Sequence, residues 1–164
     1  MLITEKIKCN FTSVREFWLF TRIFFLATLL PPMLKYLPLS MSLRLLTPNN
    51  CKKVTDFERD YLKEKIIKYT EFILSWNFLV WKKICLRQAL VLFHFFYQIG
   101  LDIQIFFGVR ENRNLSGKAA KKMLQGHAWL VSNGKIYLEI NDDYINTYAV
   151  TYRFPFDENM LITK

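Results

Sequence analysis

The chain has 164 residues, of which 52% are hydrophobic and 16% aromatic, so it can build a sizeable core and is not an intrinsically disordered chain. Its net charge of +9 is uneven, because residues 126–164 carry three basic and five acidic side chains while the basic excess lies before them. A basic body suits an acidic partner or an anionic membrane surface, whereas no helix-turn-helix or RNA-binding signature supports nucleic acid.

The three cysteines are Cys9, Cys51 and Cys85, an odd number without a CxxC pair or a Cys/His cluster of metal-binding spacing. We therefore expect no disulfide framework, no metal site and no cofactor. A reducing cytoplasm fits this cysteine usage best.

The first third of the chain is hydrophobic and predicts helices. Ser13 and Glu16 have the spacing of a capping box, which predicts a helix over 14–30. The apolar stretch from Phe17 to Leu34 includes one arginine and two prolines, so the hydrophobic segment 14–34 favours a helix at a membrane interface or in a groove over a membrane span. The following chain is expected to break into short pieces at its prolines, which are Pro31, Pro32, Pro38 and Pro48.

The remainder of the chain predicts two helices and then a sheet. Thr55 and Glu58 indicate a second capping box that opens an amphipathic helix over 55–75. A run that is apolar nearly all round predicts a buried helix over 86–99, which Gly100 ends. Strands are expected over 101–109, 126–131, 135–140 and 147–154. Helices followed by an antiparallel sheet indicate the α+β class, with a hydrophobic helical extension over 1–50 and a second domain over 51–164.

Cys85 stands where the buried helix should begin, and this position suits a nucleophile. Unpaired backbone N–H groups and the helix dipole at a helix N-terminus favour the thiolate, and the same N–H groups can stabilise an oxyanion. The competing interpretation is a buried structural cysteine, which is a common fate of a lone thiol.

The chain has two histidines that could act as the base. His94 lies nine residues after Cys85, about 13 Å along the helix and on its opposite side, so it should pack in the protein instead. His127 lies on a strand of the sheet that follows the helix, and it is expected to reach back across the helix–sheet interface.

The acid that orients the imidazole depends on the register of the hairpin. A three-residue loop at Ser132-Asn133-Gly134 pairs Val131 with Lys135 and places Glu139 opposite His127. A two-residue Asn-Gly turn pairs Ser132 with Lys135 instead, which turns Glu139 to the other face and leaves Asp142 as the reserve acid. We favour the first register because it sets a carboxylate beside the imidazole.

These residues carry a resemblance to a known family. The matching stretches are Cys85 to Leu90, Ile99 to Leu101, Phe107 to Arg110, and Gly126 to Trp129 with the hairpin after it. In this order and spacing they resemble the lasso-peptide leader peptidase, the transglutaminase-like cysteine protease of lasso-peptide biosynthesis, in its stand-alone form. The resemblance covers about 50 to 155.

The resemblance implies a transglutaminase-like (papain-like) core over 51–164 with a triad of Cys85, His127 and Glu139. The family's acid is often Asp, and its Arg three residues after the cysteine is replaced here by Gln88, with Arg87 one residue earlier. Trp129 is expected to contact the substrate.

The implied activity is removal of a leader peptide from a ribosomally made precursor through a thioester, in the cytoplasm. The implied partners are the precursor, a separate leader-recognition protein and a lasso cyclase, with a membrane contact through 14–34 as a further expectation. Two alternatives stay open, which are a transglutaminase-like acyltransferase and a non-catalytic scaffold associated with a membrane.

Overall fold

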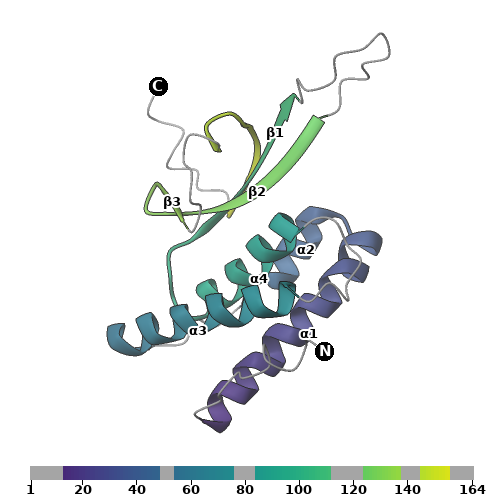
Figure 1. Ribbon diagram of the computed structural model, residues 1–164. Helices are drawn as coiled ribbons and strands as arrows, with labels where there is room; N and C mark the ends of the chain where they lie inside the picture. The colour runs from purple at the N-terminus through teal and green to yellow at the C-terminus, as the bar shows by residue number, and fades with distance from the viewer. Residues whose placement is uncertain (1–12, 49–53, 76–83, 112–123, 138–144, 156–164) are drawn as a thin grey trace, which may run out of the picture.

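The computed structural model describes residues 13–48, 54–75, 84–111, 124–137 and 145–155. In these ranges a layer of helices supports one face of an antiparallel sheet (Figure 1). The helices are α1 (Val14–Tyr36), α2 (Leu39–Leu46), α3 (Asp56–Leu74) and α4 (Ile84–Gln98). The strands are β1 (Gln104–Glu111), β2 (Leu124–Ser132), β3 (Lys135–Tyr137) and β4 (Ala149–Phe154), in the spatial order β3-β2-β1-β4. The predicted α+β class is confirmed.

Helix α4 is the centre of the core. Its side chains Leu90, Phe93 and Phe96 are fully buried, and it contacts α1, α2 and α3 on one side and β1 and β2 on the other. Gly100 ends it in a left-handed conformation (φ 76°), with hydrogen bonds from the Leu101 N–H to the Phe96 carbonyl (3.0 Å) and from the Gly100 N–H to the Tyr97 carbonyl (3.1 Å). The predicted buried helix and its glycine cap are both confirmed.

Two of the helices begin where the sequence predicts. The Ser13 hydroxyl accepts a hydrogen bond from the Arg15 N–H at 3.3 Å, and the Thr55 hydroxyl accepts one from the Glu58 N–H at 3.4 Å. These bonds satisfy backbone donors that the first turn of a helix leaves without an internal partner.

The predicted end of the first helix is wrong, because α1 continues through Pro31 and Pro32 to Tyr36. A proline inside a helix removes a hydrogen bond and costs about 3 kcal/mol. Tertiary packing compensates for this cost, since Pro31 is itself buried next to Leu30 on the inner side of α1. A further helix, α2, then forms from a segment for which we expected only short pieces.

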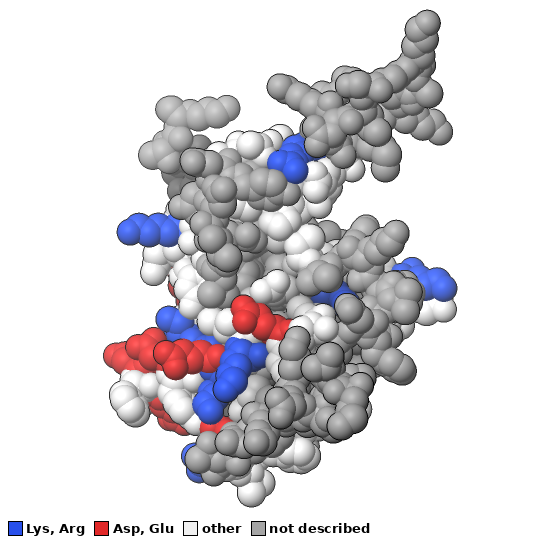
Figure 2. All heavy atoms as spheres, in the orientation of Figure 1, with Lys and Arg blue, Asp and Glu red and all other residues white. Residues whose placement is uncertain are grey.

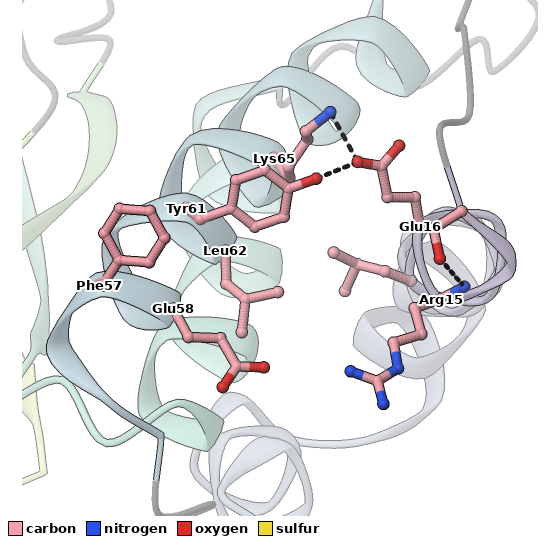
Figure 3. Close-up of a pocket in the computed structure, with 9 residues that line it drawn as sticks. Arg15, Glu16, Phe57, Glu58, Tyr61, Leu62 and Lys65 are labelled. Carbon is pink, nitrogen blue, oxygen red and sulfur yellow. Dashed lines mark hydrogen bonds and ion pairs between the residues drawn. The ribbon is translucent and has the colours of Figure 1, made fainter.

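Glu16 joins α1 to α3 through a buried network. Its carboxylate is 4% exposed, and it accepts hydrogen bonds from the hydroxyls of Tyr61 and Tyr69 while Lys65 Nζ lies 2.8 Å away. Figure 3 shows the contacts with Tyr61 and Lys65 at the rim of a pocket between the two helices. The hydrogen bond to Glu16 raises the pKa of the Tyr61 hydroxyl, and a bond to the same carboxylate raises the pKa of Lys65.

Replacing Glu16 by alanine should lower the free energy of unfolding by about 2–3 kcal/mol, because it takes this acceptor away from the partly buried Lys65 ammonium and the buried Tyr69 hydroxyl. Urea denaturation measures this loss. Glu64→Ala, at an exposed position of α3, is the matched control and should change stability by less than about 0.5 kcal/mol. Equal losses in the two variants would show that the Glu16 network does not hold the helices together.

Candidate active site

Cys85 is the second residue of α4 and a half-buried free thiol. The backbone N–H groups of this first turn have no acceptor within the helix, and the positive end of the helix dipole lies among them. The predicted position of Cys85 at the start of a buried helix is therefore confirmed. Cys9 and Cys51 lie outside the described residues.

The side of α4 that carries Cys85 faces the sheet. Ala89, Leu92 and Phe96 follow Cys85 at four, seven and eleven residues, so the four positions share one side of the helix. All three are buried, and the Phe96 ring meets the Tyr137 ring of β3 edge-on with centroids 5.5 Å apart. The thiol thus lies at one end of the interface between α4 and the sheet.

His94 is held away from Cys85, as predicted. Its Nδ1 lies 2.6 Å from the Leu46 carbonyl at the end of α2, and its ring packs edge-on against Phe95. Burial lowers the pKa of His94, which favours the neutral ring in this contact. His127 is the one other imidazole in the sequence.

His127 lies on β2 directly opposite Gly108 of β1. Its ring stacks on Trp129 at 5.9 Å between centroids and lies 5.3 Å from the ring of Tyr148. The adjacent residues Ala128 and Leu130 belong to the core that contains α4, so alternation along the strand turns His127 to the other face of the sheet. The described contacts therefore do not meet the expectation that His127 reaches across the helix–sheet interface.

Cys85 and His127 nevertheless lie toward the same end of that interface. Phe96 packs on Tyr137, which pairs with Leu130 of β2. Counted from Phe96, Cys85 lies about 16 Å back along α4, and counted from Leu130, His127 lies about 10 Å back along β2. The two elements run in the same direction, because the end of α4 leads into β1, whose first residue pairs near the end of β2. The pairing of thiol and imidazole stays a prediction.

The hairpin that follows β2 has the register that we did not favour. Ser132 pairs with Lys135, and the two-residue turn between them has positive φ at Asn133 (50°) and Gly134 (74°). Asn-Gly is the preferred pair for such a turn, whose twist matches that of the strands, and this local preference decides the register. The predicted three-residue loop is therefore wrong, and with it the reason for setting Glu139 opposite His127. Glu139 and Asp142 both lie outside the described residues.

Trp129 is 4% exposed and belongs to a second, smaller core on the far face of the sheet. Its indole lies over Gly108, where an added Cβ would stand 2.7 Å from Trp129 Cη2. The structure thus gives Trp129 a packing role, which is to cover the strand beside His127. A contact with substrate stays a prediction.

Two further residues, the aromatic Tyr148 and the basic Arg110, join the cluster of His127 and Trp129, and no pattern in the sequence predicted them. The guanidinium of Arg110 lies 4.8 Å from the Tyr148 ring centroid and bonds to the Gln125 side-chain oxygen at 2.9 and 3.0 Å. Tyr148 comes to His127 only because β4 pairs with β1. No local pattern in the sequence could reveal a contact that depends on this non-local pairing.

Arg87 is buried to 4% exposure, and burial lowers its pKa. Two residues along a helix turn its side chain about 160° from that of Cys85, so it does not share the side of α4 that carries the thiol. Within the described part of the chain, its Nε and Nη1 have no hydrogen-bond partner. In the family that the sequence resembles, an arginine stands three residues after the cysteine, where this chain has Gln88. Arg87 therefore does not take the place of that arginine.

No group of three His, Cys, Asp or Glu residues that could hold a metal ion occurs among the described residues. A family model described as the transglutaminase-like superfamily matches residues 33–153, which include Cys85 and His127. No curated protein and no solved structure matches the chain.

Substitution of Gly108 by alanine should disturb the packing beside His127, because the new Cβ would overlap the Trp129 ring and touch the Cβ of Tyr148. We expect a loss of about 1–3 kcal/mol in the free energy of unfolding, measured in urea. Gly126→Ala is the matched control on the neighbouring strand, because its Cβ would meet only the Gly108 carbonyl at 4.0 Å. If Gly108→Ala leaves the free energy of unfolding unchanged, the Trp129 indole is free to move away from the added Cβ.

Proposed function

This chain belongs to the transglutaminase-like superfamily, and on that premise we propose that it is a cysteine-dependent acyl-transfer enzyme with Cys85 as its nucleophile. The observation that carries the proposal is the place of this thiol. Cys85 is half-buried in the first turn of α4, whose N–H groups have no acceptor within the helix, and its side of the helix leads into the interface with the sheet.

The proposed reaction begins with attack of the Cys85 sulfur on a carbonyl carbon of the substrate. The new S–C bond displaces an amine, which takes the proton that the base has removed from the thiol. The backbone N–H groups at the start of α4 are suited to hold the oxyanion that forms. Water then cleaves the thioester and releases the acid, and the sulfur recovers its proton.

His127 is the proposed base. His94 already binds the Leu46 carbonyl from the opposite side of α4, and the sequence contains no third histidine. The start of β2 lies toward the same end of the interface as Cys85. The His127 ring is stacked on Trp129 on the face of the sheet away from α4, so the proposal requires the imidazole to turn toward the thiol. The rate at which iodoacetamide labels Cys85, followed against pH in the native chain and in His127→Ala, would reveal a pairing as a loss of reactivity near pH 7.

The resemblance of the sequence supports a specific substrate, which is the precursor of a lasso peptide. Cys85 would attack at the junction of leader and core, so that the leader becomes the thioester and the core leaves with a free N-terminus. A separate leader-recognition protein would present the precursor, and a lasso cyclase would receive the core in the cytoplasm. The basic excess before residue 126 would suit an acidic leader or partner.

Cys85→Ala should abolish cleavage of a lasso precursor that is co-expressed with the leader-recognition protein, since no thioester can form. Mass spectrometry of the peptides measures the outcome, and Cys9→Ala and Cys51→Ala are the matched controls that should cleave normally. Cleavage retained in Cys85→Ala would contradict the proposed nucleophile. A product that carries an added amine in place of water would identify the chain as an acyltransferase instead.

We expect Asp142→Asn to slow cleavage by about a hundredfold or more and Glu139→Gln to change it little. The reason is the observed register, because a ladder continued from Ser132 and Lys135 would set Ile140 opposite His127 and turn Glu139 away. Single-turnover rates of the two variants give the comparison. A larger loss from Glu139→Gln would return the role of the orienting acid to Glu139.

A further inference from the structure

Helix α1 carries an exposed apolar face that no described element covers, here called the outer face. It consists of Val14, Phe17, Trp18, Phe25, Leu29 and Tyr36. Trp18 is 64% exposed and Phe25 67%, values far from those of core residues. Trp18, Phe25, Leu29 and Tyr36 lie within about 40° of arc round the helix, so they form one continuous stripe. A stripe of large exposed side chains of this kind marks an interaction surface.

The inner side of α1 is fixed to the body of the protein. Ile23, Ala27 and Leu30 are buried, and α1 contacts both α3 and α4. Arg22 bonds to the Gln98 side chain of α4 at 2.8 Å and lies over the Phe95 ring. Among the described helices α1 alone is long and apolar enough to cross a membrane, but this packing holds it along the surface of the protein. The outer face thus points away from the body of the protein and runs along the length of α1.

The exposed charges that α1 and α2 contribute around the outer face are of one sign. In residues 13–48 the sole acidic residue is Glu16, and its carboxylate is turned inward to Lys65 and two tyrosines. Arg15, Lys35 and Arg44 are exposed on α1 and α2. The surface over α3 differs, because acidic and basic side chains gather there together (Figure 2). On α1 and α2, the apolar area of the outer face is therefore accompanied by exposed positive charge and by no exposed acidic side chain.

We propose that the outer face of α1 docks on an anionic membrane surface, with the helix lying in the plane of the interface. Apolar side chains would enter the boundary between headgroups and acyl chains while the neighbouring cations meet anionic headgroups. Trp18 near one end and Tyr36 at the other have the amphipathic rings that are enriched at this depth. A second copy of the chain is the competing occupant, and the test below has an outcome that identifies it.

The test is flotation of the purified full-length chain with vesicles of phosphatidylcholine alone or of phosphatidylcholine mixed with phosphatidylglycerol. We expect binding to the anionic vesicles and a loss of about tenfold or more in the double variant Trp18→Ser and Phe25→Ser. Phe57→Ser is the matched control, because Phe57 is an even more exposed ring, lies on α3 and should be dispensable for binding. High salt should weaken binding, since it screens the attraction between cations and lipid headgroups.

Absence of flotation with anionic vesicles would overturn the proposal, and so would an equal loss in Phe57→Ser. The chain without lipid is also run on a sizing column. If the native chain is a dimer and the double variant is a monomer, the outer face binds a second copy of the chain, and the membrane is excluded. Circular dichroism is used to check that the variants are folded. No step of the test depends on catalysis, so its result is independent of the result of the peptidase test.

Discussion

The structure depends on the need to cover α4 on every side. This helix is apolar nearly all round, so water must be kept from its whole circumference and not from one stripe alone. Three helices cover one part of it and the sheet covers the rest. The end of such a helix is the place where coverage stops, and there the first-turn thiol of Cys85 is half-buried. The same packing that stabilises the fold therefore brings a reactive group to the border between core and solvent.

Glu16 shows how a buried carboxylate is given bonding partners within this packing. A carboxylate in a helix–helix interface is costly unless its oxygens are bonded, and here two hydroxyls and an ammonium from α3 bond to it. The network also fixes which side of α1 is turned inward. Because the acid is used internally, no exposed acidic side chain is left on α1.

Much of the fold could be predicted from local chemistry, and the failures have definite causes. The caps at Ser13 and Thr55, the buried helix and its Gly100 cap follow from residue types at fixed spacing. The continuation of α1 through its prolines did not follow, because packing around Leu30 overrides a local rule. The hairpin register was predicted wrongly because a desired neighbour for the imidazole was given more weight than the turn preference of Asn-Gly. The side of the sheet to which His127 points could be assigned only from the observed core, because alternation along the strand does not tell which side α4 covers.

The place of α1 also bears on how the protein can be divided. The family match begins at residue 33, inside the last turn of this helix, so the matched segment by itself lacks most of α1. A fragment cut there would leave the Phe95 and Tyr69 side of the core facing water and would strand Lys65 without its carboxylate. We therefore expect the segment that folds to be longer than the segment matched by the family model, and recombinant fragments or domain fusions should begin ahead of Ser13.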